Sequence, residues 1–90
     1  MAQWSFLTNH ALVLSFLARQ PLITANEISS QIGVTERAVR KIIADFVQEG
    51  YIAKGKEGRR VRYKINYRMP LRNKTQKGKV VGDLLMVLSR

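Results

Sequence analysis

Five polar residues gather at the beginning of one predicted helix, and their chemistry suits contact with phosphate groups and with the polar edges of bases. They are Thr35, Glu36, Arg37, Arg40 and Lys41. A guanidinium fork can bind a guanine edge, a carboxylate can accept from a cytosine amine, and a hydroxyl or an ammonium can bind phosphate. The apolar residues of the same helix recur at the spacing of a single face, so we expect the polar face to stay available. This apolar face consists of Val39, Ile42, Ile43, Phe46 and Val47.

A second set of cations surrounds a predicted β-turn. The residues are Lys54, Lys56, Arg59, Arg60 and Arg62. In the segment 59–66, apolar and polar residues alternate from Arg60 to Asn66, which is the period of a strand with one buried face. Together with a strand over 51–55 and a loop at 55–58, the alternation predicts a hairpin whose apolar face packs inward and whose cationic face points out.

The positive charge of the chain is concentrated in one segment. Residues 54–79 contain eleven lysines and arginines and a single acid, Glu57, so their net charge equals the +10 of the whole chain. Such a block repels itself unless it meets a polyanion or an anionic surface. If roughly 6–8 phosphates are neutralised per protomer, the logarithm of the affinity should fall with the logarithm of salt with a slope of about −5 to −7.

Local signals set out the helices that would position these residues. Thr8 or Asn9 can cap a first helix that ends before Pro21, and its apolar residues on most sides predict a central position. The stretch TANE, 24–27, is a capping box for a second helix over 25–32. Gly33 and the cap Thr35 then lead into the helix 36–49. A last helix is predicted over 75–88.

The order of helix, short helix, glycine turn, helix and cationic hairpin resembles the winged helix-turn-helix transcriptional regulators of the MarR/ArsR kind. The likeness rests on 23–43 and 51–66, with support from the opening stretch WSFLTNHALVLSFLA. The glycine and apolar positions of such a motif are filled by Ile32, Gly33, Val34, Val39 and Ile42. The resemblance implies that Thr35, Glu36, Arg37, Arg40 and Lys41 lie in the major groove of DNA and that the hairpin contacts backbone and minor groove.

We therefore expect a mainly α fold with a small β-hairpin: a three-helix core, a wing and a C-terminal helix. Residues 1–74 would form the DNA-binding domain, and residues 75–90 a dimerisation element. The resemblance favours a two-fold dimer built from both terminal segments, with the candidate interface residues Trp4, Phe6, Leu7, Val81, Leu84, Leu85 and Leu88. The alternatives are that the last helix packs on its own domain and that the N-terminal residues belong to the core.

Other functions are disfavoured by what the sequence lacks. It contains no Cys and a single His, so we expect no disulfide, no metal site and no cofactor. No nucleophile–base pair or phosphate loop suggests an enzyme, and no long apolar run or basic N-terminal region suggests a membrane span or a signal peptide. We predict a cytoplasmic, nucleoid-associated protein that binds specific double-stranded DNA as a homodimer. The alternative is a winged-helix module that binds RNA or another protein, and no pattern identifies a small-molecule effector.

Overall fold

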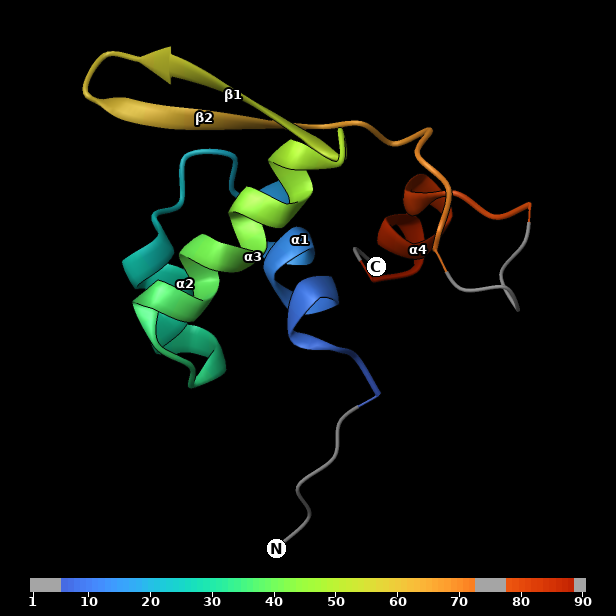
Figure 1. Cartoon of the computed structure of the whole chain (residues 1–90), viewed down its shortest axis with the longest axis horizontal. Coiled ribbons are helices and arrows are strands. Elements are labelled where there is room, and N and C mark those ends of the chain that lie inside the picture. Colours follow the sequence, from blue (N-terminus) through green and yellow to red (C-terminus); the bar gives the residue numbers. More distant parts are fainter. Residues whose placement is uncertain (1–5, 73–77, 89–90) are drawn as a thin grey trace, which may run out of the picture.

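The computed structural model describes residues 6–72 and 78–88 and begins with three helices (Figure 1). These are α1 (Asn9–Arg19), α2 (Ala25–Ile32) and α3 (Glu36–Gln48). Each starts at a threonine, Thr8, Thr24 or Thr35, whose hydroxyl accepts from the amide three residues later. The predicted starts and the capping box are thereby confirmed.

The turn between α2 and α3 follows the prediction as well. Gly33 has φ 76°, the left-handed conformation that glycine adopts without a steric cost, and its amide donates to the Ser29 carbonyl at 3.0 Å. The chain leaves α2 at this residue and enters α3 at Thr35 two residues later. The sharp turn brings the two helices together as a helix-turn-helix.

The core is centred on α1, which contacts α2, α3, β2 and α4. Val13 and Leu17 of α1, Ile28 of α2 and Val39 of α3 are completely or almost completely buried. In Figure 1, α1 lies behind α3, with α2 on one side and α4 on the other. The central position predicted for the first helix is confirmed.

The wing is a two-stranded antiparallel hairpin formed by β1 (Ile52–Glu57) and β2 (Arg60–Ile65). Its register runs from Ile52 opposite Ile65 to Glu57 opposite Arg60, so only Gly58 and Arg59 form the turn. The predicted loop at 55–58 is wrong. Gly55 pairs with Arg62 within the ladder, whereas positive φ is required only at Gly58, where it is 65°.

Only the base of the hairpin is packed on the core. Ile52 and Ile65 are buried there, and the amide of Tyr63 donates to the Pro21 carbonyl at 2.9 Å. Val61, predicted to face inward with them, is 37% exposed because the outer half of the hairpin extends beyond the core (Figure 1).

The last helix, α4 (Val81–Leu88), is shorter than the predicted helix over 75–88. Val80 instead forms an isolated β-bridge with Pro70, and Leu71 donates to the Lys79 carbonyl at 3.0 Å. The carboxylate of Asp83 accepts from the Val80 amide at 3.0 Å, which is half of a capping box and starts the helix after Val80. Residues 75–77 of the prediction lie outside the described residues. No helix in the described ranges is long and apolar enough to cross a bilayer.

Candidate nucleic-acid interface

The polar face of α3 is open to solvent, as its sequence periodicity predicts. Arg37, Arg40 and Lys41 are exposed, while Val39 and Ile42 on the other side are buried. The hydroxyl of Thr35 accepts a hydrogen bond from the amide of Ala38 at 3.0 Å. Its cap therefore fixes the start of the helix that presents the three cations.

Two of these three cations are paired with carboxylates of the same helix. Nε of Arg40 donates to Glu36 at 2.9 Å, and Nζ of Lys41 donates to Asp45 at 2.7 Å. The hydrogen bond from Arg40, followed by one from Asn26, holds the pKa of Glu36 below its usual range. Arg37 has no ion pair within residues 6–72 and 78–88. A ligand can therefore engage Arg37 without displacing a carboxylate.

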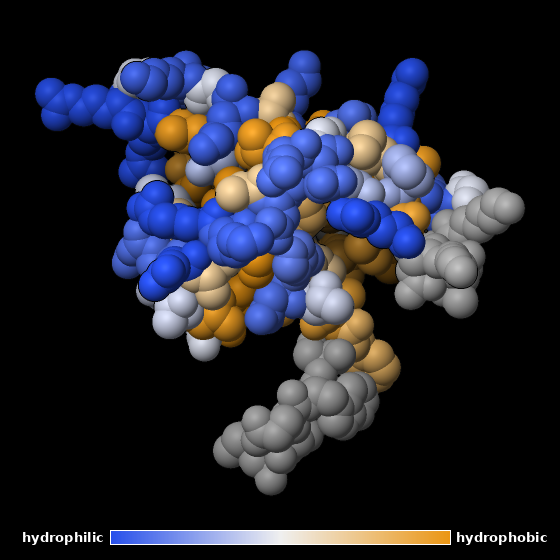
Figure 2. Space-filling model, in the orientation of Figure 1, coloured by the Kyte–Doolittle hydropathy of each residue, from blue (hydrophilic) through white to orange (hydrophobic). Residues whose placement is uncertain are grey.

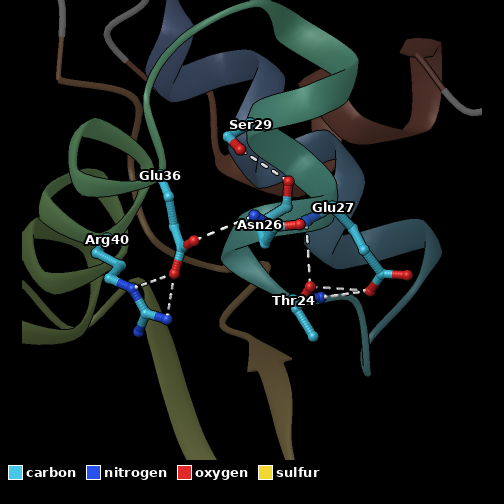
Figure 3. Close-up of polar contacts among 6 residues, drawn as sticks. All are labelled: Thr24, Asn26, Glu27, Ser29, Glu36 and Arg40. Carbon is cyan, nitrogen blue, oxygen red and sulfur yellow. Dashed lines mark hydrogen bonds and ion pairs between the residues drawn. The ribbon is translucent and has the colours of Figure 1, made fainter.

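A polar link crosses the turn between α2 and α3 (Figure 3). Nδ2 of Asn26 donates to Glu36 Oε1 at 3.2 Å, so one carboxylate is held by Asn26 and Arg40 together. The capping box beside this link joins Thr24 and Glu27 in both directions. Sequence reasoning did not identify Asn26, because its contact depends on the angle between two helices.

The hairpin register divides the predicted wing cations between its two faces. Opposite residues of an antiparallel pair point to the same side. Lys54 and Lys56 thus share a face with Tyr63 and Val61, while Arg60 and Arg62 share the other with Glu57 and Lys64. The alternation in β2 predicted that Arg60 and Arg62 lie on the same face. The face on which Lys54 and Lys56 of β1 lie follows only from the register.

Intramolecular partners hold two of the five wing cations. Arg60 donates to the Leu22 carbonyl at 3.2 Å, and Arg62 forms a two-pronged pair with Glu57 at 2.8 and 3.2 Å. This pair lowers the pKa of Glu57 and raises that of Arg62. In the part of the chain that the structure describes, Lys54, Lys56 and Arg59 form no ion pair.

A groove lies between α3, the segment 22–25 and the hairpin, and it brings the two predicted groups of cations together. Its charged lining consists of Arg40, Lys54, Arg59 and Arg60, and no carboxylate is among its lining residues in the described ranges. Figure 2 shows hydrophilic side chains projecting from the hairpin end of the molecule and spread over the front face. The groove therefore has one sign of charge along its length.

The candidate dimer residues are dispersed. Val81 and Leu85 are buried in the core of the chain itself, while Leu7, Leu84 and Leu88 are half-buried. Phe6 is 92% exposed, and Trp4 lies outside the described residues. Sequence reasoning missed the two most exposed apolar residues of α4, Met86 at 62% and Val87 at 67%. The signal for them was that α4 is apolar on most sides, more than one packing face requires.

No group of three or more His, Cys, Asp or Glu residues in the described ranges is arranged to hold a metal ion. The single histidine, His10, instead contacts α3.

Comparison with known proteins supports the same architecture. The model of the MarR family matches residues 5–60, which include α1, the helix-turn-helix and β1. The crystal structure of a predicted DNA-binding transcriptional regulator from E. coli superposes with a TM-score of 0.59, at 23% identity, over 88% of this chain and 72% of that chain. A search of the curated proteins found no match. The structural match bears on the fold, a winged helix.

Proposed function

Because this chain belongs to the MarR family, we propose that it is a sequence-specific regulator of transcription that binds double-stranded DNA as a homodimer. In this proposal α3 lies in the major groove and the hairpin follows the adjacent backbone and minor groove. It acts without catalysing a reaction, on the DNA of the cytoplasmic nucleoid.

The observation that carries the proposal is the cationic groove between α3 and the hairpin. Four cations and no carboxylate among its described lining residues make a strip of positive potential next to an exposed helix face. The major groove of B-DNA, about 12 Å wide, admits one helix, and its flanking phosphates would then meet this strip. The cationic groove alone, or the exposed helix face alone, would not select duplex DNA over another polyanion. Because the two lie next to each other, the arrangement favours duplex DNA.

The residues of α3 have separable roles in this binding mode. Arg37 is unpaired in the described part of the chain and is the best candidate for a bidentate contact with a guanine. Arg40 and Lys41 are held by Glu36 and Asp45, and ion pairs that are open to solvent contribute little to stability. Phosphate or a base edge can therefore replace the carboxylate at small cost. Glu36 becomes available to a cytosine amine when Arg40 leaves it, and Thr35 lies close enough to the helix start to touch phosphate.

The wing cations contribute electrostatic contacts. Lys54 and Lys56 share the hairpin face that borders the groove and would contact phosphates. Arg59 occupies the turn itself and, without an intramolecular ion pair in the described ranges, can enter a narrow A·T-rich minor groove. Arg60 and Arg62 are already bound to the protein and would stabilise the wing as much as the complex.

We place the dimer contact on the C-terminal element, residues 75–90, together with the N-terminal segment. Met86 and Val87 of α4 are largely exposed and, together with the exposed Phe6, provide apolar area that a second copy can cover. A two-fold arrangement of this kind would present two α3 helices about 34 Å apart, one turn of DNA.

Selection of bound sequences from a random duplex library tests this proposal. The expected result is an inverted repeat whose half-sites are separated by about one helical turn, bound far more tightly than scrambled duplex near physiological salt. Equal binding to scrambled duplex, or preferred binding to a single-stranded RNA competitor, would contradict the proposal.

A further inference from the structure

The only histidine of the chain connects the first helix to the DNA-facing side of α3. Nε2 of His10, in the first turn of α1, lies 3.1 Å from Oδ2 of Asp45. The other oxygen of the same carboxylate, Oδ1, accepts from Nζ of Lys41 at 2.7 Å. One carboxylate therefore joins an imidazole on α1 to a cation on the exposed face of α3.

The protonation states of this chain of contacts follow from its chemistry. The hydrogen bond from Lys41, followed by the one from His10, lowers the pKa of Asp45, so its carboxylate is charged at neutral pH and can only accept. Nε2 of His10 must then carry the hydrogen and donate. The hydrogen bond exists whether the imidazole is neutral or charged, but protonation of Nδ1 converts it into a bond between opposite charges.

The surroundings of His10 combine apolar side chains with four charged groups. Its ring lies edge-on to Phe46, with ring centroids 5.6 Å apart. The neighbouring charged groups on α3 are Lys41, Asp45 and Glu49, and the segment after β2 provides Arg72, which is 3.7 Å from Glu49. His10 lines a hollow together with Tyr51, whose hydroxyl donates to the Pro70 carbonyl at 2.8 Å. To this hollow α4 contributes only the apolar Val81 and Leu84.

We propose that His10 is a positioning residue that sets, through Asp45, whether Lys41 is held along α3 or released to a DNA phosphate. This inference rests on the proposed function, in which the exposed face of α3 meets DNA.

The direction of the effect is determined by the charges. With neutral His10, the single negative charge of Asp45 is matched by Lys41 alone. When His10 is protonated, two cations compete for one carboxylate, so the hold on the more exposed partner weakens. Because histidine gains its charge between about pH 8 and 5, the protein should bind DNA more tightly at the acidic end of that range.

The experiment measures DNA affinity at pH 8.0 and pH 5.5 for the full chain and two variants. We expect the wild type to bind about two- to fivefold more tightly at pH 5.5, the size of an exposed ion pair. The salt slope should steepen by about one phosphate contact. His10→Gln keeps an N–H donor but cannot gain charge, so the increase should be lost.

Asp45→Asn separates the proposed relay from a long-range effect of charge. The imidazole of His10 is unchanged in this variant, but Lys41 is released at both pH values, so the affinity should not depend on pH. If Asp45→Asn or His10→Gln keeps the pH dependence of the wild type, Asp45 does not transmit the effect and the inference is wrong.

A second measurement is independent of DNA. In an NMR pH titration, the side-chain signals of Lys41 should move with the same midpoint as the His10 ring, and should stop following it in Asp45→Asn. If the side-chain signals of Lys41 do not change together with those of the His10 ring, the inference is wrong, even if the protein binds its DNA site. Absence of specific DNA binding would contradict the proposed function, and the Lys41 signals would still decide the role of His10.

Discussion

At the scale of the residue, the cations on the exposed face of α3 differ in whether a carboxylate of the same helix binds them. Glu36 and Asp45 each hold a cation four residues away, whereas Arg37 lies between them without an ion pair in the described ranges. Pairs of this type stabilise a helix slightly and also keep long side chains in a limited set of conformations. A base contact by Arg37 requires no such pair to break, so we expect sequence discrimination to depend mainly on this residue.

Arg37→Ala should reduce the affinity for the selected site by about 1–3 kcal/mol, the energy of one bidentate base contact, and should change affinity for scrambled duplex little. Fluorescence anisotropy titrations of both duplexes provide the measurement.

Lys56→Ala is the matched control for loss of one positive charge. It should weaken binding to both duplexes alike and make the salt slope shallower by about 1. If Arg37→Ala produced this same uniform loss, Arg37 would be a phosphate contact and the assigned base contact would be wrong.

Two glycines show how the same residue type has different roles within and between elements. Gly33 ends α2 with φ 76°, a conformation that strains a residue with a Cβ. Gly55 lies in β1 without positive φ, and a Cβ built on it has no atom within 4 Å.

Gly33→Ala should therefore lower the free energy of unfolding by about 1 kcal/mol, measured by urea denaturation. Gly55→Ala should leave the free energy of unfolding unchanged or raise it slightly. Alanine can adopt the backbone conformation of this strand position, and it restricts the unfolded chain more than glycine does. An equal loss in both variants would contradict the left-handed assignment at Gly33.

The helix termini and the hairpin also link stability to pH. The Thr24 amide lowers the pKa of Glu27, and Arg40, Lys41 and Arg62 are the main causes of the lowered pKa values of Glu36, Asp45 and Glu57. A carboxyl whose pKa is lower in the folded state stabilises that state above its ordinary pKa. This contribution is lost as pH falls through the folded value.

The free energy of unfolding should thus be constant near pH 7 and should begin to fall as pH decreases below about 4.5, the ordinary value for Glu. Glu27→Gln preserves the shape of the capping box without the charge, so it should be slightly less stable than the wild type at pH 7. The two proteins should converge in stability once pH falls below the folded-state pKa of Glu27. Parallel curves from pH 7 to pH 3 would show that Glu27 does not contribute to the acid dependence.

At the scale of the whole molecule, the cationic groove and the most exposed apolar residues outside the wing lie apart. The groove contains Arg40, Lys54, Arg59 and Arg60, whereas the exposed apolar residues are Phe6, Tyr67 and two residues of α4. Such a separation allows one surface to bind a polyanion while another associates with a second copy.

Val87→Glu should shift the proposed dimer towards monomer, because association would bury an unpaired carboxylate. We expect the dimer dissociation constant to rise by about tenfold or more, measured by sedimentation equilibrium.

Val61→Glu is the control, since Val61 is an exposed valine on the wing and lies outside the proposed interface. It should remain a dimer. A Val87→Glu protein that dissociates no more readily than wild type would place the contact elsewhere.

The sequence alone determined the helix-turn-helix, because its signals are local. Thr24, Thr35 and Gly33 act on residues three or four positions away, and the spacing of Val39, Ile42 and Ile43 identifies which side of α3 is buried. The charge block and the alternation in β2 likewise predicted a cationic wing. These features do not depend on how distant segments meet.

The tertiary structure decided which of the predicted residues are available. Two contacts join distant positions: Arg60 with Leu22, 38 residues apart, and His10 with Asp45, 35 residues apart. The hairpin face on which Lys54 lies likewise follows from the pairing of two strands. In α4, Val81 and Leu85 face the core, whereas Met86 and Val87 are exposed. The rotation of α4 about its own axis that produces this arrangement depends on how α4 docks against α1. A helix that is apolar on most sides does not specify its docking face, so only the folded chain can assign it.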